Sequence, residues 1–186
     1  MCIRDRISEV IGRAAVKACK PVRGAETHGM AQRGGSVINH TRIGCTFGPM
    51  VSPGSADLLL ALEPAEALRY AHFLSPQGIA LVNTRPVLPV SVTSGLASYP
   101  PIEEILDVLS GICREVRRLD ATAIGERAGT AQAMNVVMLG ALSRYLPIPE
   151  GLLIEALAES VPCQYLETNR RAFLLGKAEV ESGQEV

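Results

Sequence analysis

The residues best equipped for chemistry gather in one short stretch, ETHGMAQRGGS, at positions 26–36. One Glu, one His, one Gln and one Arg lie there among three glycines. Gln32 and Arg33 supply hydrogen-bond donors, and a guanidinium can hold a phosphate or carboxylate through two parallel bonds. The glycines leave the backbone free to approach a ligand closely: Gly29, Gly34 and Gly35. The spacing matches neither a Walker loop nor GxGxxG, so the pattern alone slightly favours an ordinary polar turn.

The other candidate residues each have a plainer alternative role. His28 can relay a proton, although a hydrogen-bonded loop histidine is commoner and is favoured here. Glu26 can orient a neighbouring group, or is simply a strand-end carboxylate in water. Glu63 follows a buried strand, where ligands of α/β proteins bind, and suits a helix N-terminus equally well. Asn83 ends the next strand and is a weaker candidate.

The elements that must position these residues alternate between helices and strands. Positions 7–19 carry apolar residues at helical spacing and predict a helix. Positions 36–43 alternate in polarity and predict a strand with one partly wet face. Apolar runs at 57–62 and 79–83 predict strands buried on both faces, joined by a helix at 64–74 that opens on a proline. Such a strand–helix–strand unit belongs to a parallel sheet.

The remaining segments extend the same pattern. Prolines predict an extended loop at 84–100. A strand is expected at 120–124, and helices are expected at 101–109, 131–145, 149–160 and 163–176. The helix at 131–145 is apolar almost all round, so it should be deeply buried or pack at an interface. The last ten residues are polar and are expected to fray. Residues 1–186 are therefore predicted to form one domain, a three-layer, Rossmann-like α/β fold with a mostly parallel sheet flanked by helices.

The composition argues against several classes of protein. Hydrophobic residues make up 47% of the 186 and charged residues 20%, which is typical of a globular chain. The five cysteines include no Cys-x-x-Cys pair, which argues against a zinc or iron–sulfur site carried by this chain alone. Their loose spacing fits reduced thiols in a cytoplasm. No apolar run reaches the roughly 20 residues of a membrane span, and no basic stripe predicts a nucleic-acid partner.

Five separated segments resemble a known family. They are HGMAQRGG at 28–35, ADLLLALEPAEALRY at 56–70, VNTRPVLPV at 82–90, MNVVMLGAL at 134–142 and NRRAFLLG at 169–176. They are similar to segments of the gamma-type domain of pyruvate/ketoacid:ferredoxin oxidoreductases, in particular the beta subunits of indolepyruvate ferredoxin oxidoreductases. The similarity runs in order over about residues 7–177, and its specificity comes from the agreement of several separated motifs.

The resemblance implies a subunit of an enzyme that is inactive alone. In this family aryl-pyruvates react with coenzyme A to give an aryl-acetyl-CoA, carbon dioxide and reduced ferredoxin. Thiamine diphosphate serves as the electron sink and 4Fe–4S clusters carry the electrons. The resemblance implies that a larger alpha subunit holds these cofactors, that this chain holds none, and that ferredoxin and coenzyme A are met through the complex.

The resemblance also bears on individual residues. It implies that Arg33 contacts a coenzyme A phosphate or a partner carboxylate; the alternative is a rim salt bridge, which contributes little. Gln32, Gly34 and Gly35 would present donors to a ligand, or serve turn geometry alone. No catalytic residue and no metal ligand is expected in this chain.

The start of the chain departs from the family pattern. The family opens with a strand and a Gly-x-Gly-Gly-Gln-Gly turn ahead of the first helix, and Met1–Arg6 match neither. We therefore expect that the sequence is truncated, that the first strand and its turn are missing, and that residues 1–6 are not native.

Three other functions stay open from the sequence. The chain can be the gamma subunit of a pyruvate or ketoisovalerate ferredoxin oxidoreductase, because the same domain type serves those enzymes. It can be a stand-alone Rossmann-like module that binds coenzyme A or a nucleotide. It can also be a scaffold whose helix at 131–145 docks a partner and touches no ligand.

Overall fold

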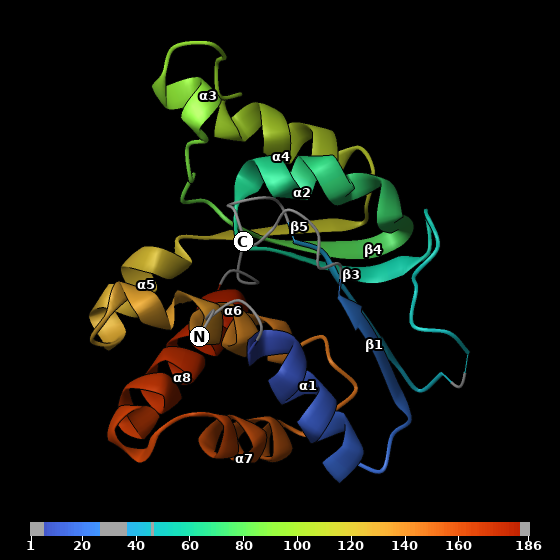
Figure 1. The fold of residues 1–186 in the computed structure, drawn as a ribbon. Coiled ribbons are helices and arrows are strands. Elements are labelled where there is room, and N and C mark those ends of the chain that lie inside the picture. The colour runs from blue at the N-terminus through green and yellow to red at the C-terminus, as the bar shows by residue number, and fades with distance from the viewer. Residues whose placement is uncertain (1–5, 27–36, 46, 183–186) are drawn as a thin grey trace. The chain divides into compact units, whose positions relative to one another are not determined.

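The computed structural model describes residues 6–26, 37–45 and 47–182 (Figure 1). The chain divides into two compact units, and each is considered by itself. One unit, here the sheet unit, comprises Ser52–Thr122. The other, here the helix-rich unit, comprises Met1–Val51 and Ala123–Val186.

The sheet unit is built on three parallel strands in the order β3–β4–β5. The strands are β3 (Ala56–Ala61), β4 (Leu74–Asn83) and β5 (Glu115–Leu119). Its helices are α2 (Pro64–Tyr70), the 3-10 turn η3 (Ala71–Phe73), α3 (Val90–Thr93) and α4 (Ile102–Ser110). The expected α/β fold, with a parallel sheet flanked by helices, is confirmed. The expected strand–helix–strand unit is β3–α2–β4, since β3 and β4 pair in parallel.

One face of this sheet is covered by α2 and α4, which lie together over β4 in Figure 1. Ala80 and Val82 of β4 are fully buried against Ala67 of α2 and against Ile105 and Leu109 of α4. Alternate positions of a strand point to one face, so Ala80 and Val82 enter this core together. The small side chains of β4 let both helices lie close to the sheet.

Burial of the two predicted strands differs. Every position of β4 from Gly78 to Asn83 is buried, as expected for the run at 79–83 except that the strand begins earlier. In β3 only Ala61 is fully buried, and Leu58 to Leu60 are half-buried, so the expected burial on both faces is wrong for this strand. The reason is position, because β3 lies at the edge of the sheet formed by the described residues.

The strand predicted at 120–124 is wrong. That segment begins the helix α5 (Ala121–Ala128), and the strand is β5, immediately before it. β5 has the sequence EVRRL, whose charged residues hide its strand character. Glu115 and Arg117 lie on one side of the strand and form an ion pair, so their charges are compensated there. In the segment that follows, Thr122 and Ile124 alternate with alanines and suggest a strand. The segment instead starts a helix, whose first backbone N–H, that of Ala121, donates to a distant side chain described below.

The helix-rich unit combines a hairpin with packed helices. The hairpin pairs β1 (Val22–Glu26) antiparallel with β2 (Asn39–Ile43). The helices are α1 (Arg6–Lys17), α6 (Met134–Ser143), α7 (Glu150–Ser160) and α8 (Leu166–Ser182), with 3-10 turns η4 (Ala131–Ala133) and η5 (Cys163–Tyr165). The helices expected at 7–19, 131–145 and 149–160 are confirmed, and α6 is deeply buried as expected. The strand β1 was not predicted.

The last helix is longer than its sequence suggests. α8 runs to Ser182, so the expected fraying of the last ten residues is wrong for those that the structure describes. Val180 is buried, and Lys177 contacts Glu150 of α7 while Arg127 pairs with Glu179. These contacts hold the polar final turns against the unit. Within the described ranges, no helix has both the length and the apolar character needed to cross a membrane.

Candidate functional site

The carboxyl ends of the three parallel strands meet at one edge of the sheet unit. β3 ends at Ala61, β4 at Asn83 and β5 at Leu119. Ligands of open α/β sheets bind outside the carboxyl ends of the strands. The two candidates Glu63 and Asn83 therefore belong to the same edge, as their positions after predicted strands indicate.

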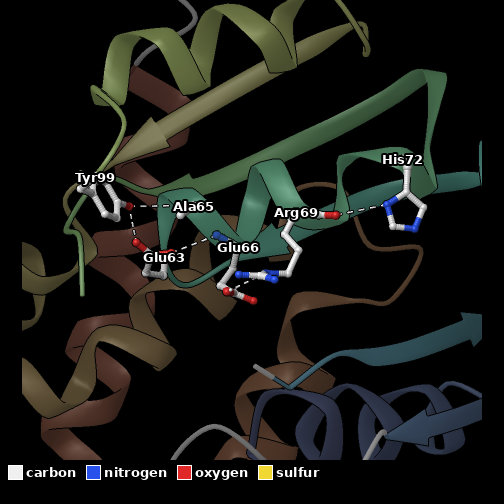
Figure 2. Close-up of polar contacts among 6 residues, drawn as sticks. All are labelled: Glu63, Ala65, Glu66, Arg69, His72 and Tyr99. Atoms are coloured by element: carbon white, nitrogen blue, oxygen red, sulfur yellow. Dashed lines mark hydrogen bonds and ion pairs between the residues drawn. The ribbon is translucent and has the colours of Figure 1, made fainter. Parts of the chain in front are cut away.

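Glu63 lies at the start of α2 and uses both carboxylate oxygens there (Figure 2). One oxygen accepts from the backbone N–H of Glu66 at 2.9 Å, which makes Glu63 the N-cap of the helix. The other accepts from the hydroxyl of Tyr99, 36 positions along the chain. The Tyr99 hydroxyl oxygen in turn accepts from the backbone N–H of Ala65 at 3.1 Å. Glu63, Tyr99 and the first turn of α2 thus form one closed network of hydrogen bonds.

Tyr99 is the member of this network that sequence reasoning missed. It stands before two prolines in a stretch read as loop, and nothing in that local pattern indicates a partner at Glu63. Its burial, and next its hydrogen bond to Glu63, raise the pKa of Tyr99 well above its ordinary value of about 10. The phenol therefore stays protonated and keeps donating to the carboxylate.

Tyr99→Phe should lower the free energy of unfolding by about 1–2 kcal/mol, because Ala65 and Glu63 both lose a hydrogen-bond partner. The folded-state pKa is raised, so this stabilisation is fully present below the unfolded-state pKa of about 10. It is lost as the pH rises through the folded-state pKa. Urea unfolding of both proteins should give a constant difference from pH 7 to about 9 and a shrinking one above 10. The exposed Tyr165 provides the control variant Tyr165→Phe, and a difference that is unchanged at pH 11 would contradict the assignment.

Asn83 is buried, with 1% of its surface exposed, and its amide joins two strand ends. The Nδ2 group donates to the carbonyl oxygen of Leu62 at 3.0 Å, just after β3. The Oδ1 atom accepts from the backbone N–H of Ala121 at 3.0 Å, at the start of α5. Asn83 therefore caps α5 from a neighbouring strand and holds the carboxyl ends of β3 and β5 on either side of β4. These two hydrogen bonds hold the strand ends together, and a role of Asn83 in binding stays a prediction.

The motif at 26–36 is only partly described. Glu26 is the last residue of β1, is half-buried, and stands opposite Asn39 in the hairpin register. The other candidate residues of the motif lie outside the described residues: His28, Gly29, Gln32, Arg33, Gly34 and Gly35. In the chain they fall between β1 and β2. Their role in binding stays a prediction.

The two histidines outside the motif, His40 and His72, both contact backbone groups. His40 in β2 is buried, its Nδ1 atom accepts from the backbone N–H of Val51 at 3.3 Å, and burial lowers its pKa. His72 lies 3.2 Å from the carbonyl oxygen of Arg69 through its Nδ1 atom (Figure 2). Among the residues that the structure describes, no group of three or more His, Cys, Asp or Glu side chains is placed to hold a metal ion.

Comparison with known proteins relates the chain to a group of redox enzymes. Residues 6–179 match the model of a family described as pyruvate ferredoxin/flavodoxin oxidoreductase. The indolepyruvate oxidoreductase subunit IorB of Archaeoglobus fulgidus is 44% identical over 178 residues, which span 95% of this chain and 89% of that relative. The IorB subunit of Thermococcus kodakarensis is 40% identical over 173 residues, 91% of this chain and 86% of that relative.

Solved structures share the fold. The gamma subunit of a keto/oxoacid ferredoxin oxidoreductase from Geobacter sulfurreducens has a TM-score of 0.66 at 21% identity, over 95% of this chain and 91% of that one. The pyruvate oxidoreductase subunit PORC of Thermotoga maritima has a TM-score of 0.66 at 22% identity, over 92% and 86%. The 2-oxoglutarate:ferredoxin oxidoreductase of Magnetococcus marinus has the same score at 19% identity, over 95% of this chain but 28% of that longer one.

Proposed function

This chain belongs to the pyruvate ferredoxin/flavodoxin oxidoreductase family, and from that membership we propose that it is the smaller subunit of an indolepyruvate ferredoxin oxidoreductase. The observation that carries the proposal is the 44% identity to an indolepyruvate oxidoreductase subunit over nearly the whole of both chains. The proposed reaction joins an aryl-pyruvate and coenzyme A, releases carbon dioxide, and passes two electrons to ferredoxin. The complex acts in the cytoplasm.

The redox cofactors belong to the larger subunit in this proposal. Thiamine diphosphate would supply the carbanion stabilisation for decarboxylation, and 4Fe–4S clusters would carry the electrons away. The cysteines of this chain support that division, because the closest two, Cys2 and Cys19, are 17 positions apart. Of those in the described residues, Cys113 is buried and its thiol donates to the carbonyl oxygen of Leu109 within its own unit. In this proposal the side chains of this subunit therefore take part in no redox step.

The chain's own contribution would be to complete the active assembly and to contact coenzyme A or the partner. We propose that the motif residues Gln32 and Arg33, with Gly34 and Gly35, present donors to a coenzyme A phosphate or to a carboxylate of the partner.

Activity should require both subunits. The chain co-expressed with the thiamine-containing larger subunit should reduce ferredoxin in a reaction that depends on coenzyme A, and either subunit alone should give no measurable rate. The kcat/KM for indolepyruvate or phenylpyruvate should exceed that for pyruvate by at least about tenfold, because an aryl group adds apolar contact area to the bound substrate. Turnover by the isolated chain would overturn the subunit assignment, and a preference for pyruvate or ketoisovalerate would overturn the substrate class.

Variants of the motif distinguish the subunit proposal from the scaffold and from the stand-alone module. Arg33→Ala in the complex should raise the KM for coenzyme A, and Arg23→Ala on the exposed part of β1 is the matched control. Full activity and an unchanged KM in Arg33→Ala would favour the pure scaffold. Binding of coenzyme A by the isolated chain would favour the stand-alone module.

A further inference from the structure

An exposed apolar segment projects from the sheet unit between β4 and α4. We call residues 86–97, which include α3, the apolar finger. Four of its large side chains face solvent, with 61% of the surface of Val87 exposed, 48% of Leu88, 81% of Val90 and 85% of Leu96. Figure 1 shows α3 and its flanking loops beyond the first turn of α4, away from the strands. Large apolar side chains that gather on a surface mark a site of interaction.

The finger is held in shape by its own backbone. Within it, the N–H of Ser94 donates to the carbonyl oxygen of Val90 at 2.9 Å, and those of Leu96 and Ala97 donate to Ser91 at 2.9 and 3.0 Å. Gly95 has φ of 76°, which lets the chain reverse after α3. The exposed apolar side chains are thus carried by a segment with backbone hydrogen bonds of its own. Such preorganisation lowers the entropy lost on binding.

Both ends of the finger are tied to the carboxyl edge of the sheet. Before it, the backbone N–H of Thr84 donates to the carbonyl oxygen of Leu119 at 3.0 Å. After it, Tyr99 donates to Glu63. The network in Figure 2 therefore anchors Tyr99, just after the finger, to the start of α2.

The charges around the finger indicate the surface that it fits. No Asp, Glu, Lys or Arg occurs from position 86 to position 102, in a chain of which 20% is charged. Arg85 precedes this stretch, Glu103 and Glu104 follow it, and all three are exposed. An uncharged apolar centre with a charged rim is the anatomy of a protein–protein interface. Its complement is an apolar pocket with polar edges on another folded protein.

We propose that the apolar finger docks into an apolar pocket of the larger subunit, an inference that rests on the proposed function above. A stable interface takes roughly 20–30 residues from each side, so a segment of this length supplies the centre of a wider contact with a folded partner. A relative with the same fold supports this occupant. The matched region makes up 28% of the Magnetococcus marinus polypeptide, so there this fold is one part of a much longer chain.

The double variant Val90→Asp/Leu96→Asp tests the docking. Both side chains are exposed, so the folded chain should keep the wild-type circular dichroism and melting profile, while the Kd for the purified larger subunit should rise at least about 30-fold. The control is Val16→Asp on α1, because 65% of the surface of Val16 is exposed. This variant should change the Kd less than about threefold.

The outcomes separate this inference from the function on which it rests. If the wild-type chain does not bind the larger subunit, the proposed function fails and the docking fails with it. If the wild type binds and the double variant binds equally well, only the docking is overturned. Equal losses in the double variant and in Val16→Asp would also overturn it. If the wild-type chain formed a homodimer and the double variant were monomeric, the finger would instead bind a second copy of this chain.

Discussion

Gly140→Ala and Gly176→Ala should each lower the free energy of unfolding by about 3 kcal/mol. The two glycines lie where α6 and α8 pack against each other. A Cβ atom at Gly140 would stand 2.0 Å from the carbonyl oxygen of Phe173, and one at Gly176 would stand 2.0 Å from that of Val137. Both obstacles are backbone atoms, so no side-chain rotation can relieve the clash and the helices must separate. Their separation would open space around Phe173, which is fully buried.

Thermal and urea unfolding of the purified chain measure this effect. About 3 kcal/mol corresponds to a fall in Tm of roughly 6–12 °C for a protein of this size. Gly12→Ala is the matched control, since Gly12 is interior to α1 and a Cβ there meets nothing within 4 Å. That variant should be stabilised by about 0.5–1 kcal/mol, because alanine favours the helix. If Gly140→Ala and Gly176→Ala melted at the wild-type temperature, the backbones of α6 and α8 would not be in contact.

Asn83→Leu should also cost about 3 kcal/mol of stability. Leucine has a similar volume, but it leaves the Leu62 carbonyl and the Ala121 N–H buried without the partners that the amide provides. Each stranded backbone group costs about 1–3 kcal/mol. Because Asn83 connects the ends of all three strands, its loss should loosen the carboxyl edge as a whole. Hydrogen exchange should then show faster exchange at Ala121 and along β5 than in α4.

Asn83→Asp separates the two hydrogen bonds. A carboxylate still accepts from Ala121, but it cannot donate to Leu62 and it buries a charge. Burial raises the pKa of such a carboxyl group, and its protonated form can donate again. The stability deficit of Asn83→Asp should therefore shrink as the pH falls towards 4, while that of Asn83→Leu should not. Asn169→Ala, at an exposed hydrogen bond to Tyr165, is the control and should cost less than about 1 kcal/mol. Equal deficits for both Asn83 variants at all pH values would contradict the assignment.

The local elements that were predicted correctly share a strong local signal. The spacing of apolar residues along α1 and the prolines at the starts of α2, α4 and α7 indicate helices through interactions within a few positions. The buried strand at 79–83 carries a run of apolar residues that few other elements would accept. The strands that the sequence did not predict are those with a weak local signal. β1 (VRGAE) contains a glycine and two charges, and β5 (EVRRL) becomes a strand because it pairs with β4.

In the candidate site too, some features follow from the sequence and others appear only in the structure. The order of elements predicts that Glu63 and Asn83 lie at one edge of the sheet, because parallel strands bring their carboxyl ends together. Their role in binding stays a prediction. The position of Tyr99 beside Glu63 and the capping of Ala121 by Asn83 were not predicted. These pairs are 36 and 38 positions apart, and no local pattern connects them. Gly140 and Gly176 would have been read as weak points in two helices, and only the crossing of α6 and α8 shows why a larger residue is excluded.

The amino-acid sequence by itself determined the α/β class, most of the helices, the membership of a family and the strand ends at which candidate residues lie. Each of these depends on neighbours in the chain or on motifs read one after another. The tertiary structure decided which side chains meet, which helices approach backbone to backbone, and which apolar residues stay in solvent. Those outcomes depend on packing between segments that are distant in sequence, because the shape and burial of one segment are set by all the others against which it folds.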